Sequence, residues 1–208
     1  MNKHLIINVG RQIGSGGRVI ATMLAKDFGC KFYDKELLDL AVKESGFSAK
    51  FFEQNDERKG FFRSVFQQRI PVLSDTNFYS NQFSQESLFK FQSDAIRKAA
   101  EEGPCVFVGR CADYILRDFP NTVNIFIMAD EDYRIEQVAK RHQCDKETAR
   151  KIMQNEENAR ANYYNYYTGK KWGNANSYDL CISTTPQGLE ATERFVKAFI
   201  EERMKHLP

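Results

Sequence analysis

The stretch from Asn8 to Arg18 reads Asn-Val-Gly-Arg-Gln-Ile-Gly-Ser-Gly-Gly-Arg and is rich in glycine. It lies between a short apolar run and a segment with helical periodicity, which is the context that a phosphate-binding loop requires. Glycines let the backbone approach a ligand closely, successive N–H groups then point into one concavity, and the following helix adds its positive end. We therefore predict that nucleotide phosphates bind to Arg11, Gln12, Ile13, Gly14, Ser15, Gly16, Gly17 and Arg18.

This stretch matches the P-loop pattern GxxxxGK[ST] only in part. If Gly16 takes the second glycine, Arg11 takes the place of the first. Gly17 then stands where the lysine belongs, and Arg18 where the Ser or Thr belongs. The lysine ordinarily reaches the β- and γ-phosphates, and the hydroxyl binds Mg²⁺. Arg18 can replace the charge but not the hydroxyl, and a glycine-rich turn without a ligand is the alternative.

Two further charged residues follow predicted strands. Asp34 comes after the run at residues 30–33, and Arg110 comes after the run at 105–108. The carboxyl ends of parallel strands meet at one edge of a sheet, where ligands bind. We therefore expect both side chains near the phosphate turn, with Arg110 as the best candidate for binding an acceptor. A helix N-cap is the alternative role of Asp34.

Three arginines in the second half of the chain lie in predicted helices. Arg134 and Arg141 are seven residues apart and so share one helix face. Arg160 lies in a later helix, next to two glutamates. Phosphoryl transfer needs positive groups around the equatorial phosphate oxygens, and arginines can supply them. The alternatives are a solvated helix face for the first two and an exposed salt bridge for Arg160.

The segments around these residues alternate between two patterns. Apolar runs of strand length occupy residues 5–9, 30–33, 105–108, 123–128 and 180–182. Helical signals occur in residues 16–28, 34–41, 84–102, 130–141, 145–167 and from 186 onward. Strands that alternate with helices predict an α/β fold with a parallel sheet and right-handed crossovers.

Residues 48–91 are less regular and contain nine of the phenylalanines. We interpret the segment at about 46–90 as a helical, aromatic insertion within a single domain that spans residues 1–208. Residues 74–83 are mostly polar and predict a loop. The sequence leaves open whether this insertion forms an acceptor lobe or a partner surface.

Composition excludes several classes of protein. A formal charge of +2 over 208 residues gives no electrostatic reason for nonspecific nucleic-acid binding. No apolar run approaches the ~20 residues of a membrane span, and a strand-like run follows the N-terminus directly, so we expect a cytoplasmic protein without a signal peptide. The five cysteines form no CxxC pair, which predicts free thiols and no protein-held metal. The oligomeric state is left open.

Several blocks of sequence carry a family resemblance. They are residues 10–18, 32–38, 108–116 and 158–169, followed by Trp172 and 178–182. Their order and spacing are similar to those of the bacterial cytidylate kinase-like family, a group of P-loop nucleoside monophosphate kinases. The resemblance implies a three-layer P-loop NTPase fold around a five-stranded parallel sheet. It also implies a nucleoside-monophosphate (NMP)-binding insertion and a short lid, which we expect at about residues 130–170.

The resemblance also implies an activity, namely transfer of the γ-phosphoryl group of ATP to a nucleoside monophosphate, with Mg²⁺ and with CMP or dCMP as acceptor. On this basis the expected catalytic residues are Arg18, Arg134, Arg141 and Arg160. The expected acceptor-binding residues are Asp34, Lys35, Arg110 and Asp113.

The chain departs from the family at two places. Cys111 follows Gly109-Arg110 where the family carries aspartate, and Lys35 follows Asp34 where it carries serine. Three functions therefore stay open: a kinase for CMP or dCMP, a small-molecule kinase with a different acceptor, and a regulatory protein that binds nucleotide without turnover.

Overall fold

The structure is a computed structural model that describes residues 4–34 and 78–206. The chain divides into two compact units, one of residues 1–35 and 96–208 and the other of residues 36–95. Several predictions fall outside the described residues: Lys35, the helix expected up to residue 41, and most of the phenylalanine-rich insertion.

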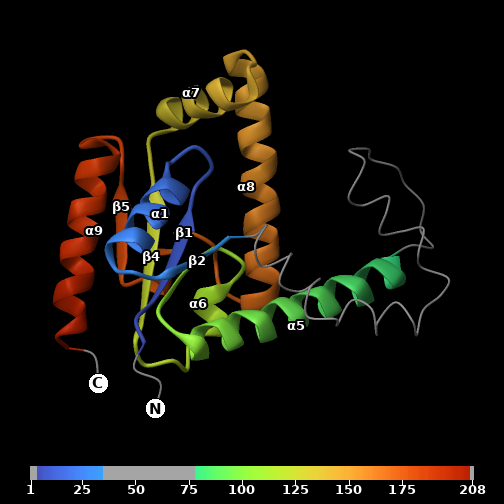
Figure 1. Cartoon of the computed structure of the whole chain (residues 1–208). Helices are drawn as coiled ribbons and strands as arrows, with labels where there is room; N and C mark the ends of the chain where they lie inside the picture. The colour runs from blue at the N-terminus through green and yellow to red at the C-terminus, as the bar shows by residue number, and fades with distance from the viewer. Residues whose placement is uncertain (1–3, 35–77, 207–208) are drawn as a thin grey trace. The chain divides into compact units, whose positions relative to one another are not determined.

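Five parallel strands form one sheet in the order β2-β3-β1-β4-β5 (Figure 1). They are β1 (Ile6–Arg11), β2 (Lys31–Tyr33), β3 (Cys105–Val108), β4 (Thr122–Met128) and β5 (Leu180–Ser183). The predicted α/β fold with a five-stranded parallel sheet is thus confirmed. Since β1 lies between β3 and β4, the turn after β1 opens near the middle of the sheet's carboxyl edge, where parallel sheets bind ligands.

The described helices are α1 (Gly17–Asp27), α5 (Phe78–Glu102), α6 (Ala112–Ile115), α7 (Glu131–His142), α8 (Lys146–Thr168) and α9 (Gly188–Met204), with a 3₁₀ turn at Ala175–Ser177. Of these helices, α1, α7, α8 and α9 match predicted ones closely, α5 begins earlier than predicted, and α6 was not predicted. The loop predicted at 74–83 is wrong for residues 78–83, which form the first turns of α5. Serine and asparagine have modest helix propensity, but propensity is a weak prior that longer-range context overrides.

One face of the sheet is covered by α1 and α9 (Figure 1). Alternate side chains of β1 point to this face, as the period of a strand requires. They pack with apolar residues of both helices in a core that includes Leu5, Ile7, Val9, Ile20, Leu24, Val196 and Ile200. This core fixes α1 directly behind the glycine-rich turn.

The turn between β1 and α1 is held from several sides. The backbone N–H of Gln12 donates to the carbonyl of Ile127 (3.0 Å), and its side-chain oxygen accepts from the N–H of Ala129 (3.1 Å). The hydroxyl of Thr184, just after β5, donates to the carbonyl of Ser15 (3.0 Å). Ile13 also packs with apolar residues of α7 and α8. The conformation of the turn is therefore fixed by β4, β5 and the α7–α8 pair together.

The hydrogen bond from Thr184 can be tested by a pair of substitutions. Thr184 is 1% exposed, so Thr184→Val preserves its shape but removes the donor from a buried carbonyl. We expect the free energy of unfolding, measured by urea denaturation, to fall by about 1–2 kcal/mol. Thr184→Ser keeps the hydroxyl and should retain more of that stability. Equal losses for both variants would show that the hydrogen bond does not hold the turn.

Candidate functional site

The backbone of the turn has the shape that anion binding needs. Gly14 and Gly16 both have φ of 79°, in the left-handed region, and α1 begins directly afterwards at Gly17. The first N–H groups of a helix have no intrahelical acceptor, and the helix dipole adds partial positive charge there. A Cβ at position 14 would lie 2.6 Å from the carbonyl oxygen of Arg134, so α7 requires glycine at this point.

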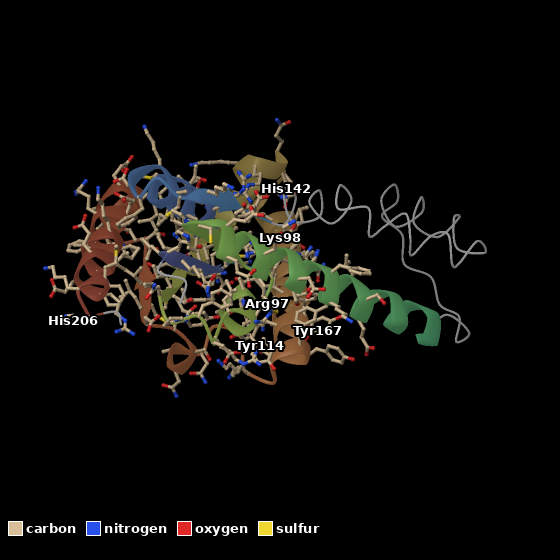
Figure 2. All side chains as sticks on the ribbon, turned by 60° about the horizontal axis from the view of Figure 1, so that its bottom comes forward. Arg97, Lys98, Tyr114, His142, Tyr167 and His206 are labelled. Atoms are coloured by element: carbon tan, nitrogen blue, oxygen red, sulfur yellow. The ribbon has the colours of Figure 1, made fainter. Side chains whose placement is uncertain are left out.

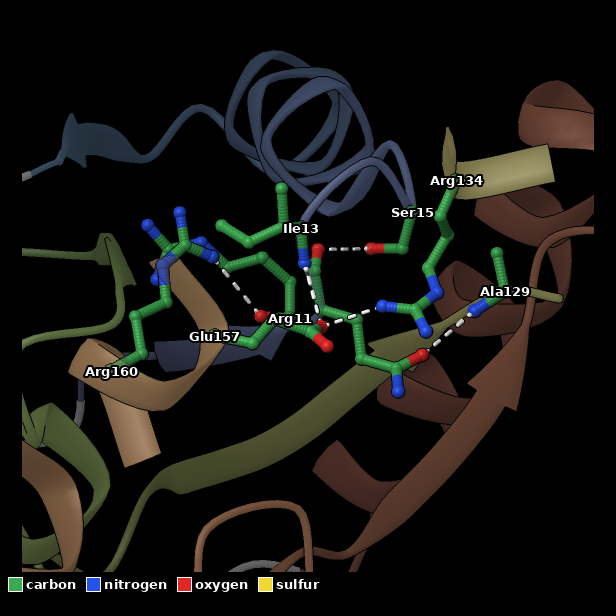
Figure 3. Close-up of polar contacts among 8 residues, drawn as sticks. Arg11, Ile13, Ser15, Ala129, Arg134, Glu157 and Arg160 are labelled. Carbon is green, nitrogen blue, oxygen red and sulfur yellow. Dashed lines mark hydrogen bonds and ion pairs between the residues drawn. The ribbon is translucent and has the colours of Figure 1, made fainter. Parts of the chain in front are cut away.

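A carboxylate contacts one of the amides of the turn. One oxygen of Glu157 (Oε1), on α8, accepts from the backbone N–H of Ile13 (3.2 Å) and from Nη1 of Arg134 (2.6 Å), as Figure 3 shows. The side chains of Arg134 and Glu157 are 9% and 19% exposed, so this ion pair is well shielded from water. The amide therefore already binds an anionic group, and that group comes from the chain itself.

Arginines from β1, from α8 and from the turn after β3 lie beside the glycine-rich turn. Nη1 of Arg160, on α8, donates to the carbonyl of Arg11 (3.2 Å), and the two side chains lie together in Figure 3. Burial, followed by the positive charges of Arg160 and Arg110, lowers the pKa of Arg11 to about 9. Burial also lowers the pKa of Arg160, against the opposing effect of two glutamates. These guanidiniums remain charged near neutral pH, so a bound anion would relieve their repulsion.

Arg18 differs from these arginines in its surroundings. Its Nε and Nη2 both donate to one oxygen of Asp34, at 3.0 and 2.6 Å. The Arg18 side chain is 64% exposed, whereas that of Asp34 is 8% exposed. The sequence placed both residues near the turn, and the structure brings them together as an ion pair. The carboxylate of Asp34 therefore compensates the charge of Arg18, which was expected to replace the P-loop lysine.

Arg110 follows β3 in an unusual backbone conformation. Gly109, Arg110 and Cys111 have φ of 76°, 56° and 57° in succession. Non-glycine residues in the left-handed region cost free energy and cluster at functional sites. The guanidinium carbon of Arg110 lies 5.4 Å from the ring centroid of Tyr163 on α8, within cation–π distance. This backbone thus directs a cationic side chain, already placed against an aromatic ring, toward the edge that carries the turn.

The tyrosines of α8 contact several of the predicted site residues. The hydroxyl of Tyr164 donates to a carboxylate oxygen of Asp113 (2.7 Å). Burial raises the pKa of this carboxyl, and the hydrogen bond offsets only part of the rise. Tyr167, labelled in Figure 2, lies 4.8 Å from Tyr163 between ring centroids. Asp113 therefore has a structural partner, and its expected contact with an acceptor stays a prediction.

Arg141 lies exposed at the end of α7, but its charge lowers the pKa of Arg160. Arg134 and Arg141 were expected to share a helix face, and Arg134 is 7% exposed because it pairs with Glu157. No sequence motif singles out Glu157 or Thr184. Each acts on a residue more than 140 positions away, and no local pattern marks such a contact.

The donors around the turn fit a phosphate chain better than a metal ion. The two carboxylates that contact its residues, Asp34 and Glu157, are each bound by an arginine. Residue 18 has no hydroxyl, and within residues 4–34 and 78–206 no three His, Cys, Asp or Glu side chains are grouped as metal ligands. Mg²⁺ at kinase sites takes several of its ligands from substrate phosphates and water. The protein alone does not form a magnesium site in this part of the chain.

The structure also bears on two sequence-based predictions outside the site. All five cysteines are free, as predicted. None of the helices in the described part of the chain is both long and apolar enough to cross a bilayer.

Comparison with known proteins identifies the family of the chain. Residues 6–186 match the cytidylate kinase-like family. A cytidylate kinase of Methanopyrus kandleri is 25% identical over 205 residues, which cover 95% of this chain and 93% of that protein. An uncharacterized protein from Eubacterium ventriosum has a crystal structure that superposes with a TM-score of 0.73 at 29% identity, over 95% of this chain and 98% of that one.

A shikimate kinase from Bacteroides thetaiotaomicron shares the fold, with a TM-score of 0.52 at 12% identity, over 95% of this chain and 98% of that one. The family match extends over most of the chain and includes the turn, the strand edge and the arginines described above. The chain therefore belongs to the cytidylate kinase-like family, and it is a nucleotide kinase, which is a class of phosphotransferase.

Proposed function

We propose that this chain transfers the γ-phosphoryl group of ATP to a nucleoside monophosphate, with CMP or dCMP as the acceptor and with Mg²⁺ accompanying the ATP. The observation that carries the proposal is the gathering of Arg11, Arg110 and Arg160 beside the glycine-rich turn. Phosphoryl transfer depends almost entirely on positioning and charge stabilisation. A backbone cradle with several converging guanidiniums supplies both.

The residues divide into groups by position. The N–H groups between Gln12 and Arg18 would hold the phosphate chain of ATP, at the positive end of α1. Arg160, Arg134 and Arg141, on the α7–α8 pair that we assign to the lid, would bind the transferring phosphate. Arg110 would bind the acceptor phosphate, because it follows β3 at the same sheet edge. Support for a cytidine acceptor comes from the family and from the name of the Methanopyrus relative.

An acceptor panel tests this function. Purified protein with Mg²⁺ and ATP should form ADP only when a nucleoside monophosphate is added, and CMP or dCMP should give the highest kcat/KM among CMP, dCMP, UMP, AMP and GMP. ADP formation with a different small acceptor alone would overturn the nucleotide assignment. Tight ATP binding without turnover on any acceptor would favour a regulatory nucleotide-binding protein instead.

Arg110 offers a test with a matched control. Arg110→Met removes the charge but keeps much of the side-chain length, and we expect the KM for the acceptor to rise at least tenfold, by about 1.4 kcal/mol or more. The KM for ATP should change much less. Arg117 lies 4.5 Å over the ring of Tyr114 and is exposed, so Arg117→Met removes a similar cation–π pair away from the turn. A comparable effect of both variants would contradict the role of Arg110.

Glu157 bears directly on the regulatory alternative. Its carboxylate lies 3.2 Å from the amide nitrogen of Ile13 and also neutralises Arg134. A phosphate approaching this amide must therefore displace a negative charge or overcome its repulsion. The contact favours a protein that holds its phosphate turn closed in the absence of nucleotide, whether or not turnover follows.

Removing the charge of Glu157 should favour anion binding. Glu157→Gln keeps an oxygen that can accept from the amide of Ile13, but it removes the charge that neutralises Arg134, so that Arg134 can bind a phosphate. We expect ATP to bind about tenfold tighter by isothermal titration calorimetry, because an unscreened charge at this distance is worth more than 1 kcal/mol. Glu147→Gln makes the same change at an exposed position on α8. Unchanged or weaker ATP binding by Glu157→Gln would show that this carboxylate does not compete with the nucleotide.

A further inference from the structure

Position 17 of the turn has no room for a side chain. Gly17 is the first residue of α1 and stands where a P-loop carries its lysine. A Cβ built on Gly17 would lie 2.5 Å from Cβ and 3.1 Å from Cγ of Arg11, and 3.2 Å from Cβ of Ile127. A distance of 2.5 Å is far inside van der Waals contact, and the atoms it joins lie at the base of Arg11 rather than at a flexible end. A lysine at 17 and an arginine at 11 are therefore mutually exclusive.

Arg11 in turn stands where a P-loop carries its first glycine. The two departures from the pattern are thus reciprocal: a long basic side chain replaces the first glycine, and a glycine replaces the lysine. Each substitution makes structural sense only with the other. The side chain at 11 fills the space that the lysine stem would occupy at 17.

From its position beside Gly17, the Arg11 side chain extends to Gly109, the residue after β3. A Cβ at Gly109 would collide with Nη1 of Arg11, and the φ of 76° at this position independently favours glycine. The carbonyl of Arg11 accepts from Arg160, and Arg110 is close enough to lower its pKa. The Arg11 side chain therefore passes Gly17 with its stem and reaches Gly109 with its guanidinium, close to Arg110 and Arg160.

Arg18 is less suited to the role of the missing lysine. Two of its nitrogens already bind Asp34, and its side chain is 64% exposed. Arg11, by contrast, is buried, and the positive charges of Arg160 and Arg110 affect it more strongly than the opposing carboxylate of Asp34. We propose that Arg11, reaching across Gly17, supplies the positive charge that a P-loop lysine places on the β- and γ-phosphates. This inference rests on the proposed kinase function and assigns to Arg11 a role that the sequence pattern gives to residue 17.

A charge-swap experiment tests the proposal on binding and turnover. Arg11→Gly should weaken ATP binding in calorimetry at least tenfold and lower kcat/KM about 100-fold or more, as for the loss of one charge-stabilising group. Arg11→Lys, which keeps the stem and the charge, should retain more of both. The double variant Arg11→Gly with Gly17→Lys restores the first glycine and the lysine of the P-loop pattern and should recover at least about tenfold of the loss. A double variant no better than Arg11→Gly alone, or full activity of Arg11→Gly, would overturn the proposal.

A second arm needs no activity. Gly17→Ala adds only a Cβ. In the wild-type background this substitution should lower the Tm, because the added atom clashes with the stem of Arg11. In the Arg11→Gly background the same substitution should lower the Tm clearly less, because only the contact with Ile127 remains. Equal shifts in the two backgrounds would show that the positions are not sterically coupled and would overturn the reciprocal arrangement.

The outcomes separate this inference from the proposed function. If wild-type protein transferred phosphate to no acceptor, the kinase proposal would fail, and the ATP-binding and Tm measurements would still decide the role of Arg11. If wild-type protein transferred phosphate but Arg11→Gly bound and turned over ATP equally well, the role of Arg11 would fail alone.

Discussion

Repulsion among arginines held close together in a poorly hydrated space is the constraint on which the site depends. Arg11, Arg110 and Arg160 come from three different elements, and burial together with neighbouring charges lowers the pKa of Arg11 to about 9. Buried charges of one sign are costly unless opposite charges compensate them, and Asp34 and two glutamates of α8 offset the pKa shifts of Arg11 and Arg160 only in part. The packing of the sheet and of the core on α1 must offset the cost of burying these like charges. An anionic ligand would lower that cost on binding.

The two carboxylates of the site divide its arginines into distinct groups. Asp34 neutralises Arg18 at the exposed rim of the turn, whereas Glu157 neutralises Arg134 and caps one amide of the turn. Since Arg134 and Glu157 lie on α7 and α8, any movement of this helix pair changes both the charge at the turn and the access to its amides. The position of α7 and α8 and the access to the amides of the turn are therefore physically linked.

Much of this arrangement could be predicted from local sequence. The apolar run at 105–108 and the glycine-rich turn after residue 9 marked their elements because hydrophobic period and backbone freedom are local properties. The helix at residues 78–83 was missed because its polar composition resembles that of a loop. The pairings of Arg18 with Asp34 and of Arg134 with Glu157 were also missed, because they depend on how distant segments pack. The clash between residues 11 and 17 needed the three-dimensional path of the turn.

The most direct measurement is a crystal structure with a non-hydrolysable ATP analogue and Mg²⁺. The account predicts the β- and γ-phosphates on the backbone N–H groups between Gln12 and Arg18, with the Arg11 guanidinium in contact with them and Glu157 withdrawn from the amide of Ile13. A nucleotide bound elsewhere, with Glu157 still on that amide and Arg11 directed away from the phosphates, would contradict it.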